Sequence, residues 1–255
     1  VAVTLPGGDF GANKGKVFVH ARFGQGDGLA LRHTYTGTAN STTFSGTDPD
    51  DTQFTLAQAW YQLDAPLSQR GEHKAVFTVG KIDPFGFFDQ NAIADDETRH
   101  FVNNVFVHNP LLDSGGDIGA DRFGFSPGAV AAYENSSDKS MPWGASLGVF
   151  GSGHGANFSG SSGKAFVMAQ AWIAPRINQL PGTYRAYAWS NARGADFDGS
   201  DARHAGVGMS LDQRFTDELT LFARYGHQTS GRVPFDDAFT VGAELDGSAW
   251  GRGSD

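Results

Sequence analysis

Polar and aromatic residues recur at every second position in several short segments of this chain, and Arg185, Tyr187 and Trp189 are the clearest example. A spacing of two places side chains on one face of a β-strand. Arginine offers a planar fork of hydrogen-bond donors, and tryptophan offers a flat ring with an N–H group. Such a face can bind a polar solute weakly and reversibly. The residues that we assign to this polar face are His20, Arg22, Gln58, Trp60, Gln62, Gln170, Trp172, Arg185, Tyr187, Trp189, Arg224 and Glu244.

Sequence patterns for metal or phosphate chemistry are not found. The chain has no His-Glu-x-x-His pair for a zinc hydrolase and no Gly-x-x-x-x-Gly-Lys loop for a phosphate. Cysteine is absent, which excludes a disulfide scaffold, a cysteine-ligated zinc ion and a thiol nucleophile. We therefore predict that the protein is not an enzyme and has neither a metal site nor a cofactor.

The composition excludes two further classes of protein. The formal net charge of -9 at pH 7 would repel the phosphates of a nucleic acid, so we expect no nucleic-acid partner. No apolar run approaches the ~20 residues of a membrane-spanning helix. A membrane β-barrel is still compatible with this composition, because only every second residue of its strands faces lipid. The 35 glycines and 21 phenylalanines suit tight turns between closely packed strands.

The elements that position the polar face are predicted to be β-strands. The alternation is clearest from Arg203 to Leu245, where every second residue is apolar and the residues between are polar or small. About ten strands follow from such segments, most of them close to the ~9–11 residues that cross a bilayer at a tilt. They are Lys16–Phe23, Gln53–Asp64, His73–Lys81, Arg122–Glu134, Trp143–Gly151, Lys164–Ala174, Thr183–Asn191, Arg203–Gln213, Glu218–Gln228 and Ala238–Asp246.

The connections between these strands alternate in length. Short ones are Ala65–Glu72, Asn135–Pro142, Pro175–Gly182 and Arg214–Asp217. Long ones are Gly24–Thr52, Ile82–Asp121, Ser152–Gly163 and Ala192–Ala202, and Thr229–Asp237 is intermediate. Short turns at one end and long loops at the other are typical of an outer-membrane barrel. A soluble β-sandwich has no reason to keep this order, so the fold predicted is a transmembrane antiparallel β-barrel.

The longest connection is expected to hold a short helix near Asp95–Asn104. Its acidic residues Asp95, Asp96 and Glu97 would lie at the helix N-terminus, with Arg99 one turn later. A loop of this length without a role is uncommon.

Part of the chain resembles the carbohydrate-selective porins of the OprB type. The similar stretches are Val79–Pro84, Phe87–Ala92, Asp95–Thr98, Phe101–Asn104, Ser126–Gly128, Gly242 and Gly251–Asp255. The resemblance spans nearly the whole chain, and its specific part is Gly80–Asn104. It implies an outer-membrane barrel of roughly sixteen strands that passes sugars passively, with a long loop folded into the lumen as a constriction.

The resemblance gives the candidate residues two roles. The polar face would line the path, since sugars stack on aromatic rings and bond to arginine donors. The loop Ile82–Asp121 would form the constriction, with Asp89, Asp95, Asp96, Glu97 and Arg99 on it. Other roles stay open: Trp60, Trp172 and Trp189 could belong to an interfacial belt. Arg185 and Arg224 could pair with loop acids, and the acidic cluster could simply begin a helix.

We expect residues 1–255 to form a single barrel domain in the bacterial outer membrane. Because the strands are few and the chain ends on the polar turn Trp250–Asp255, we expect strands to be missing at both ends. The expected partners are sugars or other small hydrophilic solutes and outer-membrane lipid, and a homo-oligomer is left open. The alternatives are a soluble carbohydrate-binding β-sandwich and an outer-membrane polysaccharide export channel or enzyme.

Overall fold

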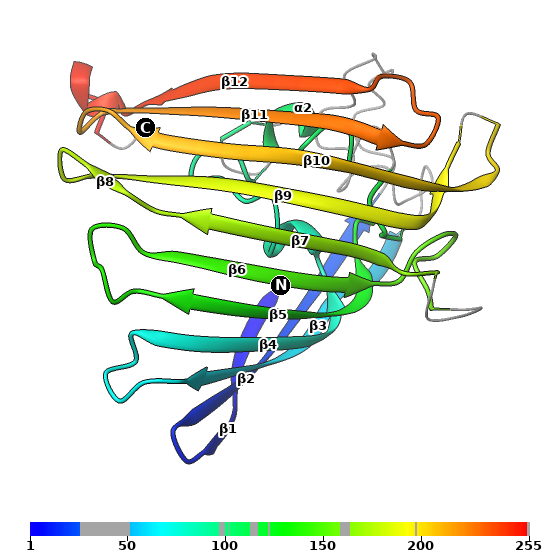
Figure 1. Cartoon of the computed structure of the whole chain (residues 1–255), viewed down its shortest axis with the longest axis horizontal. Helices are drawn as coiled ribbons and strands as arrows, with labels where there is room; N and C mark the ends of the chain where they lie inside the picture. The colour runs from blue at the N-terminus through cyan, green and yellow to red at the C-terminus, as the bar shows by residue number, and fades with distance from the viewer. Residues whose placement is uncertain are drawn as a thin grey trace.

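The regular secondary structure of the described residues is almost entirely antiparallel β-strand in a computed structural model (Figure 1). The structure describes residues 1–25, 52–96, 100–101, 103–112, 117–121, 123–158, 164–196 and 198–253. Its strands are β1 (Ala2–Phe10), β2 (Asn13–Gln25), β3 (Thr52–Pro66), β4 (His73–Ile82), β5 (Ser126–Asn135), β6 (Trp143–Phe150), β7 (Phe166–Ile173), β8 (Arg176–Ile177), β9 (Leu180–Ala195), β10 (Asp201–Arg214), β11 (Leu219–Ser230) and β12 (Asp237–Leu245). The helical segments are 3-10 turns at Pro84–Gly86 and Gly247–Trp250 and the single α-turn α2 (Asn104–Val107).

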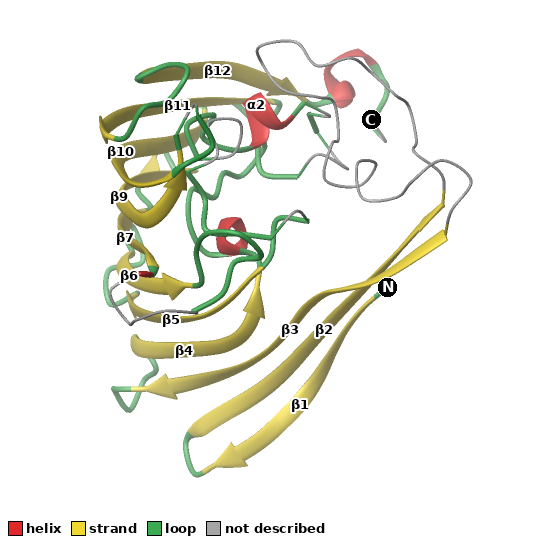
Figure 2. Ribbon diagram, turned by 90° about the vertical axis from the view of Figure 1, so that its right-hand side faces the viewer, coloured by secondary structure: helices red, strands yellow, loops and turns green. Residues whose placement is uncertain are grey.

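All strands belong to a single sheet that follows the order of the chain from β1 to β12, except that β8 pairs only with β9. Every pairing is antiparallel. The sheet curves strongly, so that one of its faces is concave (Figure 2). In the described part of the chain β1 and β12 each pair with one neighbour, which leaves the sheet two edges. The all-β antiparallel prediction is confirmed, and a sandwich of two stacked sheets is not what the described strands form.

The ten predicted strands correspond to β2–β7 and β9–β12. Two strands were not predicted. β1 contains Pro6, Gly7 and Gly8, residue types that favour turns, and the structure accommodates them with a register shift between Pro6 and Gly8. β8 has only two residues, too few for an alternating pattern to be visible.

The short and long connections lie at opposite ends of the sheet (Figure 1). We call these the turn end and the loop end. One predicted long loop, Ala192–Ala202, is wrong, because β9 continues to Ala195 and β10 begins at Asp201. Only residues 196–200 separate these two strands, and Asp196 N–H donates to Ser200 O at 3.0 Å. The predicted alternation of short and long connections is therefore broken here. The strand ends agree with the predicted lengths of the other connections, and residues 26–51 within the predicted loop Gly24–Thr52 lie outside the described residues.

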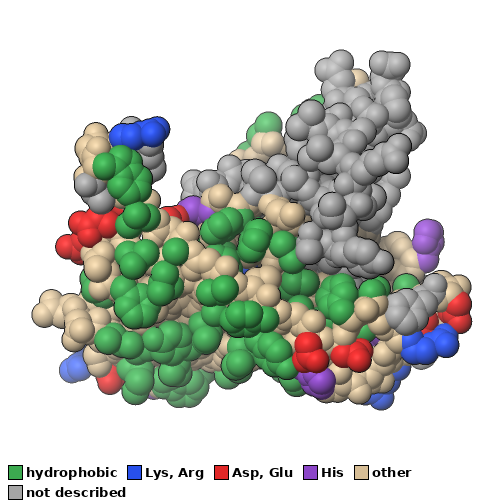
Figure 3. Space-filling view, turned by 90° about the horizontal axis from the view of Figure 1, so that it is seen from above, with side chains coloured by type: hydrophobic (Ala, Val, Ile, Leu, Met, Phe, Trp, Pro, Cys, Tyr) green, Lys and Arg blue, Asp and Glu red, His purple; other side chains and the backbone are tan. Residues whose placement is uncertain are grey.

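The convex face of the sheet is apolar and exposed. On β10 and β11, Val207, Met209 and Leu221 point outward, whereas Ser210 and Phe222 point to the concave side and are buried. The exposed hydrophobic residues of the strands include Val19, Leu56, Phe77, Val79, Leu147, Val149, Ile173, Phe239, Val241 and Leu245. Hydrophobic side chains cover much of this surface, and charged ones gather toward its two ends (Figure 3). This distribution is the one that a lipid-facing wall requires.

Aromatic pairs lie near both ends of the outer wall. Tyr133 and Trp143 are in contact near the turn end, with ring centroids 5.4 Å apart. Phe23 and Phe54 pair near the loop end at 5.0 Å, and both are largely exposed. Aromatic side chains at two levels of a wall suit the two interfaces of a membrane.

The concave side is filled in large part by the connection between β4 and β5, residues 83–125, which we call the internal loop (Figure 2). Its apolar side chains Phe85, Phe88, Leu111 and Leu112 form one core with residues of the sheet. The residues that the sheet contributes are Ile82, Val130, Phe150, Phe166, Met168, Tyr187 and Trp189. The internal loop is therefore packed against the wall as a core would be.

Two wall aromatics of this core lie across glycines on the neighbouring strand. Tyr187 pairs with Gly208 and Trp189 with Gly206 between β9 and β10. A Cβ atom on Gly208 would lie 2.4 Å from the Tyr187 ring, and one on Gly206 would lie 2.2 Å from the Trp189 ring. The close approach of the two rings to the sheet thus depends on glycine at both positions.

The helix expected at Asp95–Asn104 was misplaced. Helical structure begins where the prediction ended, in α2, with Asn103 accepting a hydrogen bond from Val105 N–H at 3.0 Å. Asp95 is not helical because the segment around it is drawn to the wall, where Ala94 O accepts from Arg224. No helix within the described ranges is long and apolar enough to cross a membrane.

The outward orientation of the apolar residues predicts a large penalty for a charge there. Leu147 lies in the middle of β6 and is 51% exposed, and Leu67 lies in a short turn and is 60% exposed. In lipid vesicles Leu147→Lys should lower the free energy of unfolding by about 2 to 4 kcal/mol. Leu67→Lys, the matched control, should change it little. Equal losses in a urea titration of the two variants would contradict a lipid-facing wall.

Candidate functional site

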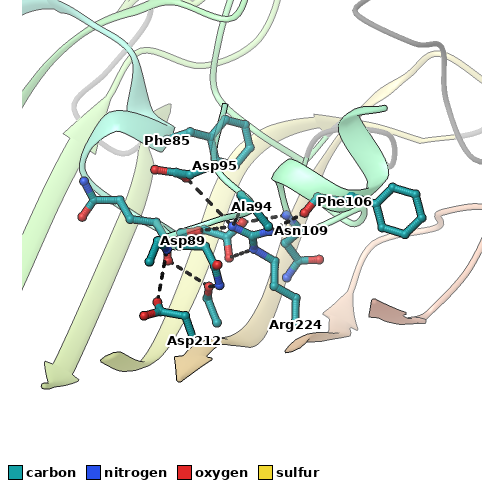
Figure 4. A network of polar contacts seen from close by, with 12 residues as sticks. Phe85, Asp89, Ala94, Asp95, Phe106, Asn109, Asp212 and Arg224 are labelled. Atoms are coloured by element: carbon teal, nitrogen blue, oxygen red, sulfur yellow. Dashed lines mark hydrogen bonds and ion pairs between the residues drawn. The ribbon is translucent and has the colours of Figure 1, made fainter. Parts of the chain in front are cut away.

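A buried ion pair joins the internal loop to the far wall of the sheet (Figure 4). Arg224 on β11 donates from Nε to Asp89 Oδ1 at 3.0 Å, and both side chains are almost fully buried, at 1% and 0% exposed. Asp89 Oδ1 also accepts from the Tyr187 hydroxyl at 2.7 Å, and Oδ2 accepts from Asn109 N–H at 2.6 Å. Asp89 has a positive φ of 56°, a conformation that costs energy for a non-glycine residue and that these bonds hold in place.

Arg224 also binds the backbone of the internal loop at three points. Its Nη2 donates to Asp89 O at 2.9 Å and to Ala94 O at 2.6 Å. Its Nη1 donates to Phe106 O at 2.6 Å. One guanidinium thus bridges two segments of the loop that are twelve or more residues apart. We call Arg224 and Asp89, with Tyr187 and Asn109, the clamp.

A second attachment lies beside the clamp on β10. Asn91 Nδ2 donates to Ser210 Oγ at 3.2 Å, and Ser210 Oγ donates to Gln90 O at 2.9 Å. Ala92 N–H donates to Asp212 Oδ2 at 3.3 Å, an oxygen that also pairs with Arg185 at 3.1 Å. Loop residues 89–94 are therefore held along β9–β11 by polar side chains of the wall.

The last part of the internal loop has a third attachment. Asp117 is buried, and its Oδ2 accepts from Trp189 Nε1 at 2.7 Å and from Gln228 Nε2 at 2.6 Å. Asp117 O accepts from Asn191 Nδ2 at 2.9 Å. Asp117 Oδ1 contacts His204 Nδ1. Four wall residues thus converge on one loop residue.

Two titratable groups of the internal loop are shifted by their surroundings. Burial raises the pKa of Asp95 to about 9, although Arg224, 3.9 Å away, opposes the shift. Burial lowers the pKa of His108 to about 3, and Arg224 adds to that effect. His108 stacks on Phe85 with ring centroids 3.8 Å apart. Both groups are therefore uncharged at neutral pH. Burial also raises the pKa of Asp89, against the opposing effects of Arg224, Tyr187 and Asn109.

The inner face of β2 and β3 is less covered than the rest. Its half-exposed side chains are Phe18, His20, Arg22, Gln58 and Trp60, while Gln62 is buried. Trp60 stacks on Phe18 with ring centroids 4.9 Å apart, and it meets Phe87 of the internal loop edge-on at 6.1 Å. Lys16 Nζ lies 5.8 Å from the Trp60 ring, and Gln58 Oε1 accepts from Trp60 Nε1 at 3.1 Å. This stripe combines apolar ring surface with polar groups at its edge.

The structure divides the predicted polar face into two sets. His20, Arg22, Gln58 and Trp60 lie on the inner side of β2 and β3 and remain half-exposed. The buried set lies under the internal loop or against the wall, and it consists of Gln62, Gln170, Tyr187, Trp189 and Arg224. The sequence predicted which side of the sheet these residues face, but not that the loop covers the second set.

Three predicted residues fall between these sets. Arg185 is half-buried by its ion pair with Asp212, an acid of the wall. Glu244 on β12 pairs with His100 of the internal loop at 2.8 Å. Trp172 lies on the inner side near the turn end, where its ring covers Gly144.

The alternatives left open by the sequence now separate. Trp60 and Trp189 face inward, so they are not interfacial-belt residues. Trp143, which was not predicted for such a belt, is exposed on the outer wall. Arg224 does pair with a loop acid, which is Asp89. Among the predicted constriction residues, Asp89 is buried and Asp95 and Asp96 are half-buried, while Glu97 and Arg99 lie outside the described residues.

Two Gly-x-Ser-x-Gly patterns, at 124–128 and 144–148, could suggest a serine hydrolase. The first leads into β5 and the second lies inside β6, whereas a nucleophile elbow needs a turn from a strand into a helix. The buried Ser126 hydroxyl donates to Gly151 O at 3.2 Å. Across the described ranges no group of histidines and acids is arranged to hold a metal ion.

The clamp predicts a strong effect of removing its cation. Arg224→Met would leave the Asp89 carboxylate buried without its partner, so the free energy of unfolding should fall by about 3 to 5 kcal/mol. Arg203 is exposed and its Nε donates to Ser190 Oγ at 3.3 Å, so Arg203→Met should change the free energy of unfolding by no more than about 0.5 kcal/mol. Urea titrations of both variants in detergent measure the difference. Similar losses would mean that the clamp does not hold the loop.

Asp95 predicts a pH dependence of stability. Because its folded pKa of about 9 lies above the ordinary value, the folded state keeps a proton that the unfolded state loses. Stability should therefore fall as the pH rises from about 4 to about 9, by up to about 1.4 kcal/mol per pH unit. Asp95→Asn removes this pH-dependent loss. The free energy of unfolding of the variant minus that of the wild type should therefore be larger at pH 8 than at pH 5. An unchanged difference between the two pH values would contradict the raised pKa.

Comparisons with known proteins agree with the fold. No family model and no curated protein matches the chain. Among solved structures, the high-pH structure of OprB of Pseudomonas putida is similar, with a TM-score of 0.56 and 14% sequence identity. The match covers 91% of this chain and 64% of that chain, so the chain spans less than two thirds of the length of OprB. The chain therefore has the fold of the OprB-type porins, as the stretches around Gly80–Asn104 predicted.

Proposed function

We propose that this chain forms a passive channel in the bacterial outer membrane for sugars or other small hydrophilic solutes. The observation that carries the proposal is the division of the inner face into two parts. The internal loop is packed against β5–β12 as a core, while the inner side chains of β2 and β3 remain half-exposed beside it. The path for a solute would run between this half-exposed stripe and the loop.

The chemistry of the stripe suits a sugar. Trp60 with Phe18 and Phe87 offers ring surface on which the C–H faces of a sugar can stack. Arg22 and Gln58 offer hydrogen-bonding groups of the kind that sugar hydroxyls accept from and donate to. Each contact is weak, and a series of weak sites allows a solute to enter and to leave.

In this proposal the internal loop narrows the channel while it is fastened to the wall. The clamp, the attachment along β10 and the bonds of Asp117 hold it against the wall at three places. Tyr187, Trp189 and Arg224 then act on the path only through the loop, because they are buried beneath it. We assign them to positioning the constriction, and we assign solute contact to His20, Arg22, Gln58 and Trp60.

The proposal includes further strands between β12 and β1. The two edge strands expose backbone groups that would be unpaired in lipid, at a cost of several kcal/mol for each group. Their outward side chains, such as Leu5 on β1 and Phe239 and Val241 on β12, are apolar and exposed. Additional strands that pair with both edges would close the barrel and place the whole outer wall in the membrane.

Single-channel recording in planar bilayers tests the function. Trp60→Ala removes the central ring of the stripe, so the affinity of sugar block should weaken by about tenfold, the equivalent of about 1.4 kcal/mol of lost stacking. The matched control is Trp143→Ala, which removes an exposed ring from the outer wall and should leave sugar block unchanged. Equal block in Trp60→Ala and the wild type would remove the stripe from the path, and absence of any conductance would overturn the channel.

A further inference from the structure

His204 is buried between two carboxylates at the loop end of β10. Its Nδ1 contacts Asp117 Oδ1 of the internal loop, and its Nε2 lies 2.9 Å from Asp196 Oδ1 in the β9–β10 connection. The imidazole is fully buried. Asp196 also accepts from Arg232 N–H and Nε, both at 2.9 Å. The contacts therefore join the internal loop to two connections at the rim of the sheet.

The number of protons in this cluster follows from its geometry. A carboxylate oxygen can only accept, and a neutral imidazole has a hydrogen on one of its two nitrogens. Two contacts between a histidine and two carboxylates therefore need two hydrogens, whether the second is held by His204 or by Asp117. The other oxygen of Asp117 accepts from Trp189 and Gln228, so it does not need a proton. If the second hydrogen were lost, a lone pair of an imidazole nitrogen would face a lone pair of a carboxylate oxygen, and the two would repel each other.

Among the residues that the structure describes, Asp117 and Asp196 are the charged groups in direct contact with His204. Gly194 of β9 and Gly231 of the β11–β12 connection lie against its ring, where added Cβ atoms would each be 2.5 Å away. Arg232 reaches the cluster through Asp196, and it also pairs with Asp198 at 2.8 Å. The charges that bear on His204 are thus Asp117 and Asp196 directly, with Arg232 and Asp198 behind Asp196.

We propose that His204 is a pH-dependent latch, which fastens the end of the internal loop to the rim while the cluster holds its second hydrogen and releases it when that hydrogen is lost. The latch is closed at low pH and opens as the pH rises. Its effect on conductance rests on the proposed channel, but its effect on the loop does not.

Amide hydrogen exchange of the refolded protein in detergent tests the latch. The reporters are the amides of Ile118, which bonds to Leu112 O, and of Arg232, which bonds to Asp196 Oδ1. Every protein compared, including the reference called the wild type below, carries Asp95→Asn, because the Asp95 carboxyl ionises in the same pH range. Between about pH 5 and about pH 9, an interval that includes the charge change of an ordinary histidine side chain at about pH 5 to 8, protection corrected for intrinsic exchange should fall about tenfold, as expected for one lost charge-assisted hydrogen bond.

Two variants separate a latch from a merely structural histidine. His204→Gln should lose the pH dependence, and so should Asp196→Asn, in which the amide can donate to a neutral His204 and keep the contact without the second hydrogen. The matched control, His227→Gln, removes an exposed histidine that pairs with Asp237 at 2.9 Å and should behave as the wild type.

The outcomes are distinct. Constant protection of the wild type across this range would overturn the latch, and so would a pH dependence that persists in Asp196→Asn. If exchange behaves as expected while bilayers show no conductance, the latch stands and the proposed channel fails.

Discussion

The structure depends on how an irregular loop satisfies its backbone hydrogen bonds inside a β-sheet. A buried segment without helix or strand leaves donors and acceptors that water cannot reach. Arg224 donates hydrogen bonds to three loop carbonyls and to the Asp89 carboxylate, and so satisfies four of these acceptors. Arginine suits this role because its donors are fixed in a plane and its charge is kept at any ordinary pH. Without it, Asp89 and three loop carbonyls would lose a donor in a place that water does not reach.

This constraint explains why the two halves of the concave side differ. Where wall residues such as Tyr187 and Asp212 bind the internal loop, they are removed from water and serve the fold. Where the loop meets β3 through the rings of Phe87 and Trp60, the polar side chain of Gln58 nearby remains half-exposed. The same residue types, arginine and tryptophan, therefore act as structural parts on β9–β11 and as candidates for solute contact on β2–β3.

Sequence reasoning predicted the strands and the side of the sheet that each residue faces, because both follow from a local period of two. It could not predict the burial of Arg224 or Trp189, since their partners Asp89 and Asp117 are 135 and 72 residues away. The helix near Asp95 failed for the same reason: a long-range bond from Arg224 outweighs a local preference. β1 was missed because Pro6 and Gly8 resemble a turn until the neighbouring strand is known.

The two glycines that lie beneath Tyr187 and Trp189 have a consequence for the width of the proposed channel. Gly208 and Gly206 have no side chain beneath these two rings, so the rings lie close to the sheet. The internal loop, which packs on the rings, therefore lies close to the sheet as well. A methyl group at either glycine would lift the ring, and the loop packed on it would be displaced toward β2 and β3. The width of the proposed channel would thus depend on residues behind the internal loop, which a passing solute would not touch.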